Sequence, residues 1–144
     1  MVEEADLDRL VLELAARVDD GVVILDREGR VRLWNEGARA IFGYDAGSAL
    51  GHGLELIVPE RLWNRHREGF AAAMARGATR YAGRLLAVPA RHRDGHSLSI
   101  EFRVVLLGGD PPTAVGAIIR DVTERVERER RAAEAGPGES EPRR

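Results

Sequence analysis

The stretch RLWNRHREGF, residues 61–70, contains the histidine best placed for chemistry. His66 follows Leu62 by four residues and precedes Phe70 by four, so on a helix these side chains share one face. Met74 continues that face by one further turn. An inward imidazole there is either a ligand for a metal or cofactor iron, or a core histidine that donates to a backbone carbonyl.

Composition removes several other kinds of site. The chain has no cysteine, which excludes disulfides, thiolate metal ligands, iron–sulfur clusters and thiol nucleophiles. His92 and His96 flank a predicted turn at Asp94 and Gly95, so we expect both to face solvent without forming a zinc site. No Ser/His/Asp set, phosphate loop or carboxylate pair occurs at a catalytic spacing, so we expect no enzyme.

Length and charge indicate the class of protein. The 144 residues fit one domain. A net charge of -2 supplies no positive field for phosphates, so we expect no nucleic-acid partner. No apolar run of about 18 residues occurs, and the first ten residues, MVEEADLDRL, are acidic rather than signal-like. We therefore expect no membrane association and a cytoplasmic location.

The first eighteen residues predict an amphipathic helix. Leu7, Leu10, Leu14 and Val18 form one apolar face, with Val11 beside it. Little chain is left to cover this face, so we expect the helix to pair with a second copy in a homodimer. The charged exit helix at the other end has few apolar residues, so its contribution to such pairing should be weak.

The rest of the chain alternates strands, turns and helices. Hairpins are predicted over GVVILDREGRVRLWN and RYAGRLLAVPARHRDGHSLSIEFRVVLL, and TAVGAIIRDV predicts a fifth strand. Between the hairpins we expect short helical turns, then a helix over 60–76 that Gly77 ends. This order predicts an α+β fold, a five-stranded antiparallel sheet with helices on one face. The expected divisions are an N-terminal helix 1–18, a sheet domain 19–122, an exit helix 123–135 and a disordered tail 136–144.

Over about residues 17–125 the sequence resembles the PAS domain family, the sensory box of bacterial signalling proteins. The resemblance rests on DGVVILDREGRVRLWNEGARAIFGY, on Gly51 with IVP after it, and on RDGHSLSIEF and GAIIRDVTER. The family's closing Asp-x-Thr falls on Asp121 and Thr123. It implies a PAS fold with a sensing pocket between sheet and helices, and coupling through the terminal helices. No output module is visible in these residues, so we expect the signal to pass to a separate effector protein, or the chain to be a fragment of a larger sensor.

Within that family, VPERLWNRHREGF followed by RDG resembles the haem-binding PAS domains of the oxygen-sensing histidine kinases of nitrogen-fixing bacteria. The resemblance makes His66 the match of the haem ligand and implies b-type haem that senses oxygen, CO or NO. The match of the oxygen-binding arginine is Leu86, so a distal hydrogen bond would have to come from Arg84, two residues earlier. Arg80 matches a residue near the haem propionates.

The remaining expected pocket residues are apolar. Phe70 and Met74 lie on the helix, Phe102 and Val104 alternate inward on a strand, and Ile118 lies on the last strand. All five suit a haem or another apolar ligand, and all are equally good core residues. The alternative is therefore a PAS domain without haem that dimerises, or that binds a small apolar or acidic ligand.

Overall fold

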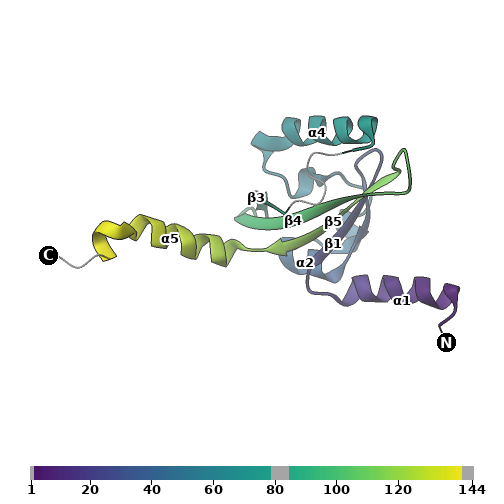
Figure 1. Ribbon diagram of the computed structural model, residues 1–144, viewed down its shortest axis with the longest axis horizontal. Coiled ribbons are helices and arrows are strands. Elements are labelled where there is room, and N and C mark those ends of the chain that lie inside the picture. Colours follow the sequence, from purple (N-terminus) through teal and green to yellow (C-terminus); the bar gives the residue numbers. More distant parts are fainter. Residues whose placement is uncertain (1, 79–84, 141–144) are drawn as a thin grey trace.

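A five-stranded antiparallel sheet forms the centre of the computed structural model, which describes residues 2–78 and 85–140, with side chains up to residue 135 (Figure 1). Its strand order is β2-β1-β5-β4-β3, and every neighbouring pair is antiparallel. The strands are β1 Gly21–Asp26, β2 Val31–Trp34, β3 Leu86–Arg91, β4 Ser97–Leu107 and β5 Ala114–Asp121. The predicted α+β fold and five-stranded antiparallel sheet are confirmed.

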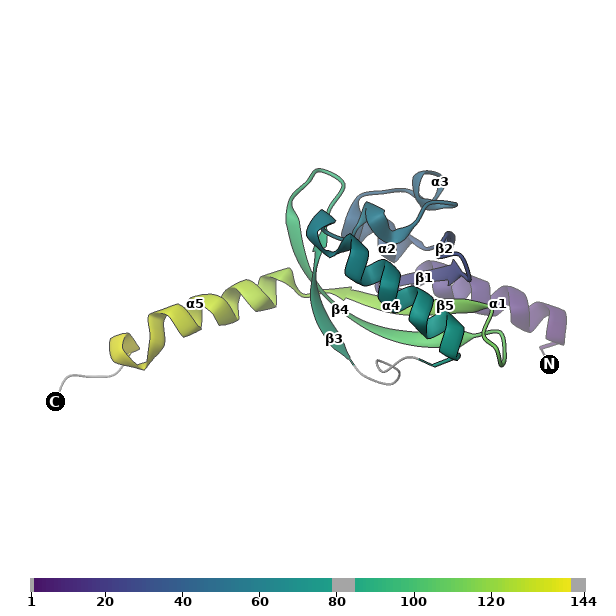
Figure 2. The same ribbon diagram turned by 90° about the horizontal axis from the view of Figure 1, so that it is seen from above.

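Helices flank this sheet. They are α1 Glu4–Arg17, α2 Glu36–Phe42, α3 Ala46–Ala49, α4 Trp63–Arg76 and α5 Thr123–Ser140, with short 3-10 helices η1 Leu54–Leu56 and η2 Glu60–Leu62. Figures 1 and 2 show α4 crossing over one side of the sheet, with α1 on the opposite side and α5 leading away from it. Within the described residues, no helix is long and apolar enough to cross a membrane.

The core lies between the inner face of the sheet and the helices that follow β2. Burial alternates along β1, which is the pattern of a strand with one face covered. Phe42 and Val31 are fully buried, and the Trp34 ring packs on Phe42 with ring centroids 5.6 Å apart. The Trp34 indole N–H donates to the Tyr44 carbonyl oxygen at 2.8 Å, so its polar atom is satisfied inside the core.

Asn35 joins three elements from one buried position. Its Oδ1 accepts from the backbone N–H of Ala38 at 2.9 Å, which is the predicted N-cap of α2, and from the N–H of Val22 in β1 at 2.8 Å. Its Nδ2 donates to the carbonyl oxygens of Ala15 at 2.6 Å and Asp20 at 3.0 Å. The end of α1 is therefore tied to the sheet and to α2 through one side chain.

The long helix begins and ends close to where the sequence predicts. Its first turn is the 3-10 helix η2, because the N–H of Leu62 donates to the carbonyl oxygen of Pro59 three residues earlier at 2.8 Å. Gly77 ends α4 in the left-handed region with φ +69°, which glycine adopts at little cost. The expected span 60–76 is thus divided into η2 and α4.

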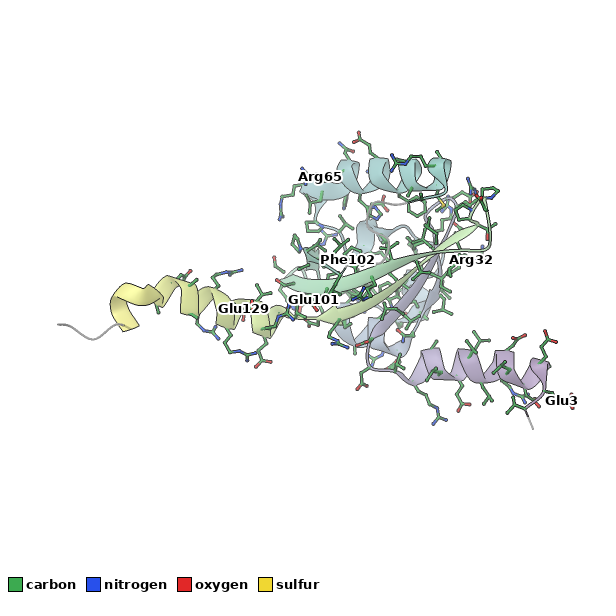
Figure 3. The ribbon with its side chains drawn as sticks, viewed as in Figure 1. Glu3, Arg32, Arg65, Glu101, Phe102 and Glu129 are labelled. Carbon is green, nitrogen blue, oxygen red and sulfur yellow. The ribbon has the colours of Figure 1, made fainter. Side chains whose placement is uncertain are left out.

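Short contacts hold the start of α5 against the sheet. The Thr123 hydroxyl donates to the Asp121 carboxylate at 2.6 Å and accepts from the N–H of Ser99 in β4 at 2.9 Å. Arg125 pairs with Glu101, which Figure 3 shows beside the first turn of α5. The exit helix is therefore attached to β4 as well as to β5, the strand that leads into it.

The two terminal helices, α1 and α5, are largely exposed. α5 continues to Ser140, past the expected end at residue 135. Of the expected tail 136–144, residues 141–144 lie outside the described residues. α1 has no buried residue, and its apolar face stays open, with Leu10 44% and Leu14 65% exposed.

Candidate functional site

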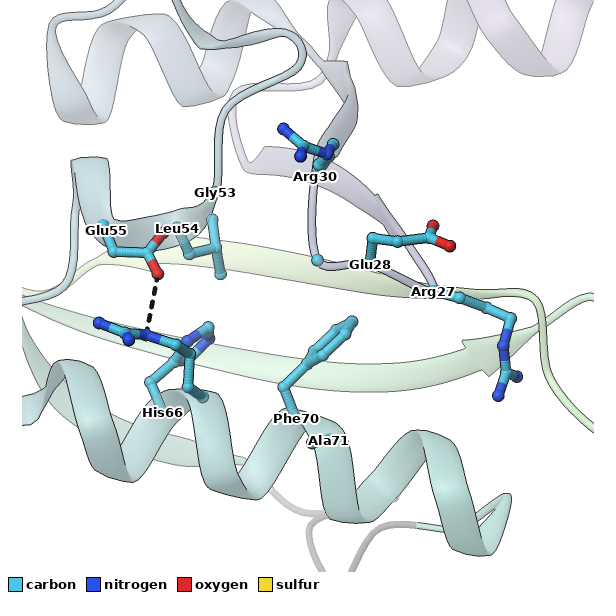
Figure 4. A pocket seen from close by; sticks show the side chains of 11 residues that line it. Arg27, Glu28, Arg30, Gly53, Leu54, Glu55, His66, Phe70 and Ala71 are labelled. Atoms are coloured by element: carbon cyan, nitrogen blue, oxygen red, sulfur yellow. Dashed lines mark ion pairs between the residues drawn. The ribbon is translucent and has the colours of Figure 1, made fainter.

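A cleft of about 500 Å³ lies between α4, the β1–β2 turn and η1 (Figure 4). Its volume is within the range of small-molecule sites, about 300–1,000 Å³. It is lined by Arg27, Glu28, Gly29, Arg30, Gly53, Leu54, Glu55, His66, Arg67, Phe70 and Ala71. Two of the residues predicted for the pocket, His66 and Phe70, are therefore brought together at one cleft.

The His66 imidazole is directed into this cleft from the first turn of α4 (Figure 4). Its ring stacks beside Phe70, with centroids 6.4 Å apart and 27° between the ring planes. Burial lowers the pKa of His66 below its usual range, and the neighbouring Glu55 only partly opposes this effect. The neutral imidazole, which carries a free lone pair, is therefore the favoured form near neutral pH.

Charged side chains surround the opening. Glu55 and Arg67 form an ion pair, with Oε1 and Nε 3.5 Å apart. Arg30 donates to the Gly51 carbonyl oxygen at 3.2 Å, and Arg27 donates to the carbonyl oxygen of Pro112. Three guanidinium groups against two carboxylates give the rim an excess of positive charge, which suits an anionic group on a ligand.

The β1–β2 turn reaches the cleft through long-range backbone contacts. Arg30 forms an isolated antiparallel bridge with Gly53. The N–H of Val31 donates to the His52 carbonyl oxygen at 2.8 Å, and the N–H of Gly51 donates back to the Val31 carbonyl oxygen at 2.8 Å. Sequence reasoning missed the arginines of this turn, because no local pattern shows that a hairpin turn will lie opposite a helix that starts over thirty residues later.

Among the residues that the structure describes, the other predicted pocket residues do not line the cleft. Met74 is buried at 5% exposure. Leu86, Phe102 and Val104 are half-buried, and Phe102 packs against the hydrophobic core. Arg80 and Arg84 lie outside the described residues.

Ile118 was expected in the pocket, and the structure places it on the opposite face of the sheet. It pairs with Arg103 of β4 and is 44% exposed, whereas its neighbour Ile119 is buried in the core. Successive side chains of a strand point to opposite faces, so the partners of Phe102 and Val104, Ile119 and Ala117, face inward and Ile118 must face outward.

The donor set of the cleft fits a haem group at two points. The His66 imidazole, whose pKa is lowered by burial, could hold an iron, and its place on a regular helix fixes its direction. The guanidinium groups of Arg27, Arg30 and Arg67 are suitable partners for carboxylates such as the propionates. Phe70 supplies apolar contact on the same wall.

The five-stranded antiparallel sheet, with α4 crossing over one side of it (Figure 1), defines an α+β module. The family model described as PAS fold matches residues 16–127. The chain therefore belongs to the PAS family, and it is a sensory domain of the kind used in signal transduction.

Two relatives match most of this chain. An uncharacterized protein of Azorhizobium caulinodans is 32% identical over 108 residues, which cover 74% of this chain and 15% of the relative. Sensor protein FixL of Bradyrhizobium diazoefficiens is 23% identical over 118 residues, which cover 81% of this chain and 23% of FixL. The chain thus spans less than a quarter of the length of either relative. The FixL match fits the resemblance to oxygen-sensing kinases drawn from the sequence.

A solved structure supports the fold independently. The PAS domain of a protein from Colwellia psychrerythraea superposes with a TM-score of 0.71 at 22% sequence identity, covering 83% of this chain and all of that one. At this level of identity the similarity concerns the fold alone.

Proposed function

We propose that this PAS domain holds b-type haem through His66 and senses a diatomic gas such as oxygen, CO or NO. The observation that carries the proposal is the half-buried imidazole of His66 on the wall of the cleft, at the position that matches the haem ligand of the oxygen-sensing kinases. Burial lowers the pKa of this imidazole, which favours its neutral form. A bound haem would supply an iron with one axial position open for a gas.

Each part of the cleft has a role in this proposal. His66 orients the group from α4, and the rim arginines neutralise its carboxylates. Leu86 stands where the relatives have an oxygen-binding arginine, and it cannot donate a hydrogen bond. Leu86 also does not line the cleft, so we propose a gas response that does not depend on a hydrogen bond from this position.

An absorption spectrum tests the proposal. The purified chain is mixed with haemin, freed of excess, and compared with His66→Ala and with His52→Ala, which alters an exposed histidine outside the cleft. We expect a Soret band in the wild type and in His52→Ala, and loss of that band in His66→Ala. Circular dichroism of the variant checks that it is folded. A wild type that remains colourless after this treatment overturns the haem proposal.

A second function is favoured by the charge of the rim. Without haem, the cleft could hold a small carboxylic acid, with its carboxylate against the rim guanidinium groups and its carbon chain against Phe70. Thermal unfolding with succinate and with octanoate tests this alternative. A rise in Tm that is absent in Arg30→Gln supports it, and an unchanged Tm with both acids argues against it.

We also propose that α1 mediates a homodimer, from which the signal passes to a separate effector protein. The exposed apolar face of α1 and the exposed outer sheet residues Val105 and Ile118 are surfaces that a second copy would cover. Light scattering of Leu10→Ser/Leu14→Ser should give the mass of a monomer where the wild type gives that of a dimer. A monomeric wild type would contradict this assignment.

A further inference from the structure

The turn between β3 and β4 gathers three metal-ligating side chains. Donor atoms of His92, Asp94 and His96 all lie within 4.8 Å of one another. The two imidazole rings stack with centroids 4.5 Å apart and 18° between their planes. No sequence pattern indicates this grouping, and both histidines were expected to face solvent without forming a zinc site. The tight turn instead brings residues two and four apart to the same side.

Both rings present a nitrogen to the same carboxylate. Nδ1 of His92 accepts from the backbone N–H of Asp94 at 3.1 Å and lies 3.3 Å from Oδ1 of Asp94. Nδ1 of His96 is hydrogen-bonded to the same carboxylate oxygen. Two imidazole nitrogens and one carboxylate oxygen are a common ligand set for zinc and similar divalent transition ions. The ligands of such an ion are spaced about 3.3 Å apart, so small torsions of these side chains are enough to close the set.

The backbone already holds the turn in shape. The N–H of His92 donates to the His96 carbonyl oxygen and the N–H of Gly95 to the His92 carbonyl oxygen, each at 2.9 Å. Gly95 has a φ of +98°, which a residue with a side chain rarely adopts. The three ligating residues therefore lose little backbone freedom on binding an ion, which favours affinity.

The site is also anchored to the body of the domain. The N–H of Arg93 donates to the carbonyl oxygen of Phe42 at 2.9 Å, which ties the turn to the end of α2. The His92 ring rests on Gly43, where an added Cβ would lie 2.5 Å from its Cε1 atom. The His92 side chain is only 23% exposed, whereas His96 and Asp94 are open to solvent. One ligand is thus fixed and the other two can adjust.

We propose that His92, Asp94 and His96 bind a divalent transition-metal cation of the zinc class, with water completing its coordination. The site is on the β3–β4 turn, which contributes no residue to the cleft beside His66. An ion bound there would brace the turn that joins two sheet strands to the end of α2. This proposal is independent of whether the cleft holds haem.

Calorimetric titration with Zn²⁺ tests the proposal. The chain is used without a polyhistidine tag, because such a tag binds the same ion. We expect one ion per chain in the wild type and at least a tenfold weaker affinity in His96→Ala and in Asp94→Asn. His52→Ala and His66→Ala, whose histidines are outside the group, should bind like the wild type. Absent binding in the wild type, or equal binding in His96→Ala, overturns the proposal.

Cobalt gives a readout that depends on the ligands directly. Co²⁺ held by two imidazole nitrogens in a site with fewer than six ligands absorbs visible light more strongly than the hydrated ion. We expect such bands with the wild type and with His66→Ala, and their loss in His96→Ala. Conversely, His96→Ala should keep any Soret band and His66→Ala should lose it, so failure of the metal proposal is distinguished from failure of the haem proposal. A spectrum equal to that of hydrated Co²⁺ rejects the site.

Discussion

Replacement of Asn35 by alanine should lower the free energy of unfolding by about 3–5 kcal/mol. The loss of the N-cap of α2 costs about 1 kcal/mol. The variant also leaves the Val22 N–H and the carbonyl oxygens of Ala15 and Asp20 without this partner, and each unsatisfied buried group costs about 1–3 kcal/mol. We take values at the low end, since these bonds are only partly buried. Such a loss is a large part of the 5–15 kcal/mol that typically stabilises a domain.

Urea unfolding followed by circular dichroism measures this loss. Asp45→Ala is a matched control, because the Asp45 side chain caps α3 through the Ser48 N–H at 2.8 Å, a hydrogen bond within its own segment. Its cost should be clearly smaller. Asn35→Asp keeps the bonds accepted from the Val22 and Ala38 N–H groups but turns a charge toward the carbonyl oxygens of Ala15 and Asp20. Its cost in unfolding free energy should therefore lie between those of Asn35→Ala and Asp45→Ala. Equal costs for Asn35→Ala and Asp45→Ala would refute the reasoning.

Two further predictions concern His66 and the glycines. Burial lowers the pKa of His66, so the unfolded chain binds a proton at this imidazole more readily than the folded chain does. The free energy of unfolding should therefore fall as the pH drops from 7 through the unfolded pKa of about 6.5. The urea midpoint of haem-free protein should fall less over this range in His66→Gln, and equal falls in the variant and the wild type would contradict this. Gly37→Ala should destabilise the domain strongly, because the new Cβ would collide with the Asp20 carbonyl oxygen. Gly69→Ala, in open space on α4, should instead stabilise the domain by about 0.5–1 kcal/mol. Thermal melts compare the two variants, and equal effects would contradict the packing argument.

The elements of the fold could be predicted because their signals are local. The hairpin at Asp94–Gly95 follows from the turn preference of that pair, and the end of α4 follows from Gly77. The inward direction of His66 follows from spacing along one helix. In each case the residues that decide the structure lie within a few positions of one another.

The contents of the cleft could not be predicted in the same way. Which face of a strand points inward depends on register with its neighbours, and a shift by one residue reverses it, which is why Ile118 was misplaced. The approach of Arg30 to α4 depends on its bridge to Gly53, a contact between distant segments. The grouping of His92 with His96 depends on side-chain torsions at a turn, which sequence spacing does not specify.

Because α5 is attached to the sheet at its start, a small rotation there would be amplified along the helix. Its 18 residues rise about 27 Å at 1.5 Å per residue, and Figures 1 and 2 show it free of the sheet beyond its first turns. A rotation of about 10° at the Thr123 junction would move the far end by about 5 Å. The start of α5 is held against β4 by Ser99 and Glu101, so it acts as the pivot. A displacement there that is too small to alter the core could thus move the far end of α5 by about the rise of one helical turn.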